Sequence, residues 1–308
     1  YSCLQNVLIN MIELLEQSEQ IVSRAPKKFK RYLYNQIEWK NRLIGIKGAR
    51  GTGKTTLILQ RLHELALPVE KAVYLSLDDL YFTNHSLSEF FRTFYKQGGQ
   101  FLFLDEVHKY PAWAREVKNI HDSHPDISIV FTGSSIVDIS RQEADLSRRV
   151  LVYELFGLSF REYLEYQQII QISPLSLESV LTQKNYLKNI FPANFRPYQH
   201  FSDYLNYGYY PFFTEDVKGY HQRLRQLVRL IVEYDMAELQ MFDIRNSRKM
   251  LRLLQVISEQ VPFKPNLVKL SQKTKIHRNT LTSYFIFLEE ARLVKLLYHE
   301  GISISQLQ

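Results

Sequence analysis

Continuous apolar runs of strand length recur through the first half of the chain, and segments of helical periodicity separate them. The apolar runs lie at residues 43–46, 72–77, 101–104, 127–131 and 150–155. The amphipathic segments between them lie at residues 54–67, 86–95, 112–122 and 136–146. Apolar strands that alternate with helices are typical of a parallel sheet with helices on both faces. The pattern therefore predicts an α/β fold for this half.

Helical periodicity dominates on either side of that region. Residues 4–22 gather apolar side chains on one face and predict an amphipathic helix. After about residue 157 the strand signal fades, and helices are expected at residues 159–168, 175–190, 199–207, 218–240 and 246–259. The last segment predicts helices at 266–272 and 278–291 and an apolar strand at 293–297. This order predicts a winged helix-turn-helix after an all-α region.

The turn between residues 46 and 54 carries the first candidate site. Its sequence fits G-x-x-x-x-G-K-[ST], a P-loop, in which backbone N–H groups and a helix N-terminus face phosphate oxygens. Lys54 is expected to reach the β- and γ-phosphates of ATP, and the Thr55 hydroxyl to bind Mg²⁺. A glycine-rich turn is the alternative, which the flanking strand and helix disfavour. The residues expected to bind ATP are Gly48, Ala49, Arg50, Gly51, Thr52, Gly53, Lys54, Thr55 and Thr56.

Two acidic residues follow the apolar run at 101–104. Asp105 is expected at the C-terminal end of a parallel strand, where α/β proteins bind ligands, and is predicted to hold Mg²⁺. Glu106 is predicted to orient and polarise the water that attacks the γ-phosphate. Taken alone, adjacent acids after a strand indicate solvated loop residues. Their combination with the P-loop favours the catalytic interpretation.

Two further segments carry candidate polar residues. Thr132 and Ser134 follow the run at 127–131, where a hydroxyl would sense the γ-phosphate; a turn with a serine helix cap is the alternative. Arg148 and Arg149 precede the run at 150–155. Arg149 is the candidate arginine finger toward a neighbouring subunit, which implies a homo-oligomer. A solvated pair or a salt bridge is the alternative for both arginines.

Composition narrows the class of protein. The 308 residues suffice for two or three domains, and a 45% hydrophobic content allows sizeable cores. The single cysteine, Cys3, excludes an internal disulfide framework, and no apolar run reaches the roughly 18 residues of a membrane helix. We therefore expect a cytoplasmic protein with no membrane partner. The formal charge of +7 permits a nucleic-acid partner without requiring one.

As a set, these motifs resemble the prokaryotic predicted ATPases of the AAA+ superfamily. Besides the P-loop, the resemblance rests on Leu-Asp-Glu-Val-His at 104–108, Thr-Gly-Ser-Ser at 132–135 and Leu-Ser-Arg-Arg at 146–149, which leads into 155–163. The family usually has Leu-x-Gly-Arg at the third motif, so Arg149 aligns with its arginine and Arg148 replaces its glycine. The family also carries a nuclease-like C-terminal domain, but no nuclease activity is assigned to residues of this sequence.

The resemblance implies a division into four parts. These are an N-terminal helical extension at 1–40, an AAA+-like P-loop ATPase domain at 41–156, a helical lid-like region at 157–260 and a winged-helix domain at 261–308. In the last part, Lys275 and Arg278 flank the start of the expected second helix, and Asn279 follows. Basic side chains there would contact DNA phosphates, with Arg278 and Asn279 at base edges. A winged helix that serves as a packing module is the alternative.

Three functions follow from these features. The first is Mg²⁺-dependent ATP hydrolysis that drives or switches a conformational change. The second is an ATP-regulated DNA-binding protein that uses the winged helix. The third is a module that holds nucleotide and rarely hydrolyses it, which the pair Asp105 and Glu106 disfavours. A small-molecule kinase is disfavoured because no acceptor-binding signature is present.

Overall fold

The computed structural model describes residues 2–133, 146, 148–182, 191, 194–236, 243–260 and 264–297. The helix predicted at 136–146, the candidate Ser134 and much of the helix predicted at 175–190 lie outside the described residues, apart from Leu146 and residues 175–182. No helix among the described residues is long and apolar enough to cross a membrane.

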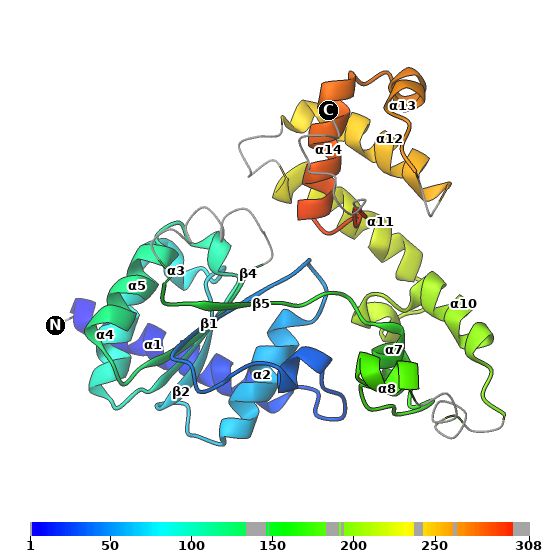
Figure 1. The fold of residues 1–308 in the computed structure, drawn as a ribbon. Helices are drawn as coiled ribbons and strands as arrows, with labels where there is room; N and C mark the ends of the chain where they lie inside the picture. Colours follow the sequence, from blue (N-terminus) through cyan, green and yellow to red (C-terminus); the bar gives the residue numbers. More distant parts are fainter. Residues whose placement is uncertain are drawn as a thin grey trace.

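A parallel five-stranded sheet organises the first half of the chain (Figure 1). Its strand order is β2-β3-β4-β1-β5, and all neighbouring strands are parallel. The strands are β1 (Leu43–Lys47), β2 (Ala72–Ser76), β3 (Phe101–Asp105), β4 (Ser128–Gly133) and β5 (Leu151–Glu154). The predicted parallel α/β sheet is confirmed. Because all strands run the same way, the segments that follow β1, β3 and β4 meet at one edge of the sheet.

Helices cover both faces of the sheet, as predicted. Side chains alternate along β3: Phe103 joins a buried cluster with α2 (Lys54–Leu65), whereas Leu102 and Leu104 join a cluster with α4 (Leu87–Lys96) and α5 (Trp113–Ser123). This alternation makes the apolar runs continuous in β1 to β4, because these strands are buried on both sides, whereas β5 is partly exposed. A short helix between β2 and α4, α3 (Tyr81–Asn84), was not predicted.

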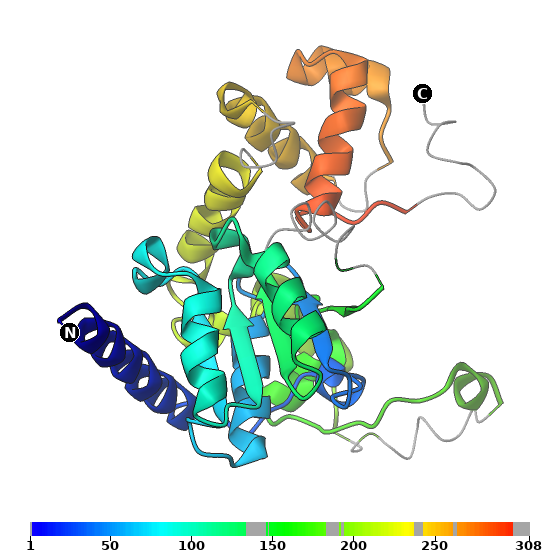
Figure 2. The same cartoon turned by 90° about the vertical axis from the view of Figure 1, so that its left-hand side faces the viewer.

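The first helix, α1 (Ser2–Ser23), lies beside the edge strand β2 (Figure 2). The buried hydroxyl of Ser18 accepts a hydrogen bond of 2.9 Å from the backbone N–H of Tyr74 in β2. An edge strand leaves such groups without a strand partner, and α1 therefore satisfies and covers this edge.

The second half contains only helices among its described residues. They are α7 (Phe160–Tyr166), α8 (Leu177–Thr182), α10 (Pro197–Tyr207), η3 (Pro211–Thr214), α11 (Tyr220–Leu230), a π-helical turn (Ile231–Asp235), η5 (Ile244–Asn246), α12 (Ser247–Ser258), α13 (Leu267–Thr274) and α14 (Arg278–Glu290). One buried cluster spans both sides of residue 260, because Leu253 of α12 packs with Leu270 and Leu281 of the two helices that follow. The predicted boundary at 260–261 stays a prediction.

The strand predicted at 293–297 is wrong. Helix α14 ends in a turn in which Arg292 has a φ of 60° and the N–H groups of Leu293 and Val294 both donate to the carbonyl of Leu288. The N–H of Leu296 donates to the Glu289 carboxylate at 3.0 Å. This apolar segment therefore folds back on its own helix, and none of the described residues pairs with it as a strand. The helix-turn-helix is present, and the described residues include no wing.

Candidate nucleotide-binding site

The P-loop joins β1 to the N-terminus of α2. Gly51 and Gly53 have φ values of +81° and +93°, which residues with a Cβ rarely adopt. A Cβ on Gly48 would lie 2.2 Å from the carbonyl oxygen of Leu155, so the loop also requires a glycine at its start. Lys54 is 4% exposed, and its ammonium group donates to the carbonyls of Gly48 and Ala49 at 3.0 Å each. The loop thus holds its lysine at the position where phosphates are expected.

Asp105 is the centre of a network at the C-terminal edge of the sheet. Its carboxylate is 3% exposed. It accepts hydrogen bonds from the hydroxyls of Thr55 at 2.7 Å and Tyr74 at 2.9 Å, and from the hydroxyl of Thr132. The structure therefore brings together the two residues predicted to bind Mg²⁺. Asp105 ends β3, and Thr55 follows β1, which is separated from β3 by β4.

The oxygen atoms of Thr55 and Asp105 fit Mg²⁺. This ion takes oxygen ligands and is usually held by one or two protein groups together with substrate phosphates and water. No group of three or more His, Cys, Asp or Glu side chains suited to a metal ion occurs in the described part of the chain.

Thr132 links the two acidic residues. Besides its bond to Asp105, its hydroxyl accepts a hydrogen bond of 3.2 Å from the backbone N–H of Glu106. Thr132 is fully buried at the end of β4. Of the two candidate sensors, Thr132 thus lies in the Asp105 network, whereas Ser134 lies outside the described residues.

Glu106 is held in an unusual backbone conformation and contacts a histidine. Its φ of 51° lies in the left-handed region, which is strained for a residue with a side chain. Its carboxylate lies 3.3 Å from Nε2 of His108, whose side chain is 1% exposed. Burial, helped by the charges of Lys109, Lys54 and Arg50, lowers the pKa of His108 to about 3. The imidazole is therefore neutral at physiological pH.

Sequence reasoning missed Tyr74 and His108 as part of this site. Tyr74 comes from β2, next to β3 in the sheet, and only the strand order brings its hydroxyl to Asp105. Burial, with the neighbouring Asp105 carboxylate, raises the pKa of Tyr74, so it acts as a hydrogen-bond donor. His108 stood within the motif at 104–108 and could have been singled out by its position two residues after Glu106.

Arg149 lies where the strands of the sheet begin, at the end opposite to the P-loop. It precedes β5, whose first residue, Leu151, pairs with Ile44 near the start of β1, whereas the P-loop follows the end of β1. A strand of this length separates the two edges by about 15 Å. The guanidinium donates to both oxygens of Asp122 at 2.7 and 3.0 Å. The arginine-finger role stays a prediction, and the geometry places Arg149 away from the P-loop of its own chain.

An aromatic segment of the all-α half touches the P-loop. A Cβ on Gly51 would lie 3.2 Å from the ring of Phe212, and Pro211 approaches Gly53. The rings of Tyr210 and Phe212 stack with centroids 5.3 Å apart. The aromatic segment 210–212 therefore lies against the P-loop as well as in its own buried cluster.

Comparisons with known proteins agree with the fold of the first half. Residues 40–164 match the family described as an AAA domain, and residues 198–302 match a domain of unknown function (DUF8612). The parallel sheet of residues 43–154 lies within the region that matches the AAA family, and the two findings together support a P-loop AAA domain there.

A relative in Methanocaldococcus jannaschii, the uncharacterized protein MJ1637, is 30% identical over 306 residues. The aligned region covers 91% of this chain, but the chain spans only 64% of the length of that relative. Among solved structures, the Hsp104–ADP complex of S. cerevisiae aligns at 17% identity over 90% of this chain and 41% of its own, with a TM-score of 0.42. DnaA from Aquifex aeolicus bound to AMPPCP aligns at 17% identity over 92% and 90%, with a TM-score of 0.34. These TM-scores are too low to carry an argument.

Proposed function

We propose that the chain binds ATP with Mg²⁺ and hydrolyses it. The observation that carries the proposal is the contact of 2.7 Å between the Thr55 hydroxyl and the buried Asp105 carboxylate, directly beside a P-loop lysine. A hydroxyl and a carboxylate at the N-terminus of a helix supply the cation ligands, and the loop supplies the phosphate donors.

Each residue has a defined part in this proposal. Lys54 exchanges the carbonyls of Gly48 and Ala49 for the β- and γ-phosphate oxygens when ATP enters. Thr55 and Asp105 hold Mg²⁺, which when bound neutralises charge that develops on the phosphates. Glu106 orients the attacking water and accepts its proton.

The all-α half is the part that responds to nucleotide in this proposal. The segment 210–212 contacts Gly51 and Gly53, so phosphates that reorganise the loop also act on the helices packed behind it. Hydrolysis would thereby drive or switch a movement of the helical region against the sheet.

To test this proposal, ATP binding and ATP turnover are measured for the parent protein and for the Lys54→Ala variant. A fluorescent ATP analogue should bind the parent protein in the presence of Mg²⁺ and bind the variant about a hundredfold more weakly, since charge-assisted bonds to both the β- and the γ-phosphate are lost. Equal affinity of the two proteins would refute the P-loop assignment. Lys47→Ala is the control for the loss of a lysine, because Lys47 is the last residue of β1, just before the loop.

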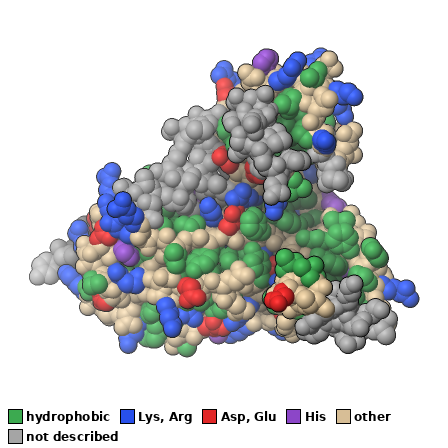
Figure 3. All heavy atoms as spheres, in the orientation of Figure 1, with side chains coloured by type: hydrophobic (Ala, Val, Ile, Leu, Met, Phe, Trp, Pro, Cys, Tyr) green, Lys and Arg blue, Asp and Glu red, His purple; other side chains and the backbone are tan. Residues whose placement is uncertain are grey.

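A second candidate function, ATP-regulated DNA binding, is favoured by the surface of the helix-turn-helix. Lys275, Arg278 and Asn279 are all exposed at the start of α14, and Lys269 of α13 is exposed beside them. Figure 3 shows Lys and Arg side chains gathered over this upper part of the molecule. Basic side chains on such a surface could bind DNA phosphates, and Arg278 and Asn279 at the start of α14 could contact base edges.

A further inference from the structure

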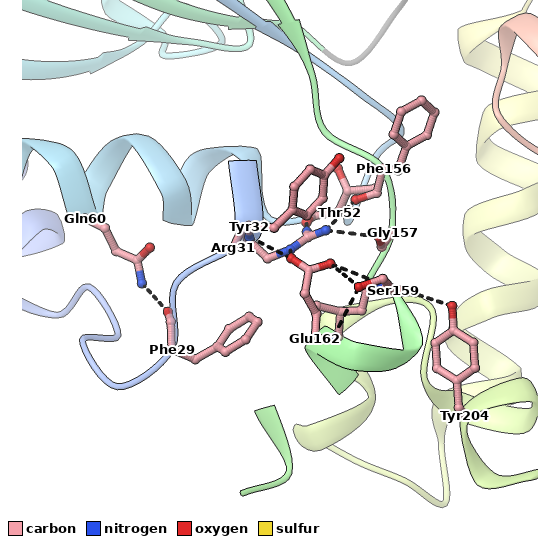
Figure 4. Close-up of polar contacts among 11 residues, drawn as sticks. Phe29, Arg31, Tyr32, Thr52, Gln60, Phe156, Gly157, Ser159, Glu162 and Tyr204 are labelled. Carbon is pink, nitrogen blue, oxygen red and sulfur yellow. Dashed lines mark hydrogen bonds and ion pairs between the residues drawn. The ribbon is translucent and has the colours of Figure 1, made fainter. Parts of the chain in front are cut away.

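A buried arginine connects the P-loop to the helical region (Figure 4). Arg31 belongs to the segment between α1 and β1, and it is 5% exposed. Its Nη1 donates to the carbonyl of Thr52 in the P-loop. Its Nη2 donates to the carbonyls of Phe156 at 2.7 Å and Gly157 at 3.0 Å, in the linker between β5 and α7.

The fourth acceptor of Arg31 is Glu162 of α7, which is 2% exposed. The Nε–carboxylate distance is 2.9 Å. The same carboxylate accepts the N–H of Tyr32 at 2.9 Å and both donors of Ser159, at 2.9 and 3.0 Å, in a capping box. Burial acts to raise the pKa of Glu162, but the hydrogen bond and charge of Arg31 outweigh it and leave the pKa lowered. The pair is therefore ionised, and each of the three nitrogen atoms of the guanidinium donates at least one hydrogen bond.

Stability alone is a weak reason for such a pair. Removing two charges from water costs several kcal/mol per ion, and apolar side chains of similar volume often serve stability as well or better. What the pair provides is geometry: a planar fork that fixes four acceptors from three segments in one arrangement. The segment that carries Arg31 is itself fixed, because Gln60 of α2 donates to the carbonyls of Pro26 at 2.6 Å and Phe29 at 2.8 Å.

The contact with Thr52 bears directly on phosphate binding. A trans peptide group points its C=O and N–H in opposite directions, so a donor that holds the carbonyl of Thr52 also fixes the N–H of Gly53 on the other side. In a P-loop, these backbone N–H groups are the donors to phosphate. The charge on the guanidinium also polarises the peptide group and strengthens its N–H as a donor.

We propose that Arg31 is a positioning residue of the nucleotide site, which orients the peptide between Thr52 and Gly53 and couples it to α7. This role rests on the proposed ATP binding. Phosphate bound at Gly53 and the position of α7 then act on the same guanidinium. Glu162 is the partner that orients Arg31.

The test compares Arg31→Lys with Arg42→Lys. Lysine keeps the charge but lacks the fork, so one ammonium group cannot reach both Thr52 and the linker. Arg42 also donates to backbone carbonyls, those of His121 at 2.9 Å and His124 at 2.8 Å, but at the opposite edge of the sheet. Arg31→Lys should raise both the Kd for a fluorescent ATP analogue with Mg²⁺ and the KM for ATP about tenfold, the effect of one lost charged hydrogen bond, and change kcat less. Arg42→Lys should leave the Kd and KM unchanged.

A second measurement separates positioning from simple stabilisation. Amide exchange of residues 159–166 should slow when the ATP analogue binds the parent protein and should not respond in Arg31→Lys. Glu162→Gln, which keeps the shape of the side chain, should show the same two changes to a smaller degree and decides the matter if Arg31→Lys does not fold. A lowered Tm with unchanged Kd and an intact exchange response would overturn the inference. If the parent protein itself bound no ATP analogue, the proposed function would fail instead.

Discussion

At the level of single residues, the site is a set of short contacts around two acids with different surroundings. Asp105 accepts hydrogen bonds from three hydroxyl groups, which fix the orientation of its carboxylate. Glu106 is 26% exposed on its side chain and lies beside the neutral imidazole of His108. Glu106 is thus the more exposed of the two acids, which favours it over Asp105 as the proposed base.

The first residue-scale prediction concerns Glu106→Gln. The amide keeps the size of the side chain and loses the base, so kcat should fall by about 10²–10⁴, while the Kd for ATP changes little. A turnover assay and a binding titration on the same preparation measure both. Asp78→Asn, a change of an exposed acid in the turn after β2, controls for loss of a negative charge nearby. Turnover by Glu106→Gln at the parent rate would move the base role to another residue.

The second residue-scale prediction is a pH dependence of stability set by His108. The folded state holds the pKa of His108 at about 3, below its ordinary value of 6.5. The unfolded chain therefore takes up the proton first as the pH falls below 6.5, and the folded state loses stability through the window from 6.5 to about 3. At pH 5 this group alone should remove about 2 kcal/mol relative to pH 7.5.

Urea unfolding without nucleotide and Mg²⁺, at pH 7.5, 6 and 5, measures this effect in the parent and in His108→Gln. The difference in unfolding free energy between the two proteins should shrink as the pH falls. His63→Gln, at the far end of α2, controls for the loss of an imidazole. A constant difference between parent and His108→Gln across this range would contradict the buried neutral imidazole.

At the level of elements, the strands and most helices were predictable, because each has a local signal. All five apolar runs became strands, and β1 to β4 are buried on both faces, which explains the continuous apolar residues along them. The strand prediction at 293–297 was wrong because an apolar run also occurs where a chain folds back on the helix that precedes it. Here the N–H of Leu296 donates to the Glu289 carboxylate of α14. Period and composition do not distinguish these two outcomes.

The element-scale prediction concerns α14. Lys275→Ala with Arg278→Ala should weaken any binding to duplex DNA and lower the slope of log K against log salt by about 0.9 per lost phosphate contact. A mobility shift at several salt concentrations measures both. Lys27→Ala with Lys28→Ala removes the same charge from exposed positions before Arg31 and is the matched control. If the parent protein gives no shift at low salt, α13 and α14 serve as a packing module.

At the level of the whole molecule, the site draws on segments that are distant in the sequence. Motifs located Thr55 and Asp105, because their chemistry requires fixed residue types at fixed spacing. No local pattern could reveal Arg31 or Tyr74, whose roles follow from where the chain returns to the P-loop. The C-terminal helices also reach the linker, since Arg292 pairs with Glu154 and lies 5.8 Å over the ring of Phe156. Both halves of the chain thus contact the segment between β5 and α7.

The last prediction concerns Arg149 and an assembly of several subunits. Arg149 lies near the start of the strands, away from the P-loop of its own chain, so a role on a γ-phosphate requires the P-loop of a neighbouring subunit. Arg149→Ala should then keep ATP affinity and lose about 10³–10⁵ in turnover, and the parent's activity per subunit should rise with protein concentration. Mixing Arg149→Ala with Glu106→Gln subunits should restore turnover, because each supplies the group that the other lacks.

The ion pair with Asp122 provides the control for this prediction. Asp122→Asn breaks the pair of 2.7 Å but keeps the guanidinium. If Arg149 acts on phosphate, Asp122→Asn should retain turnover, because a freed guanidinium can still bind phosphate oxygens through its planar fork. If Arg149 serves only to hold α5 to the start of β5, Asp122→Asn and Arg149→Ala should lower the Tm alike and leave turnover per folded subunit unchanged. A monomer that is fully active at every concentration would likewise exclude a role across subunits, and would leave Arg149 as half of a surface ion pair.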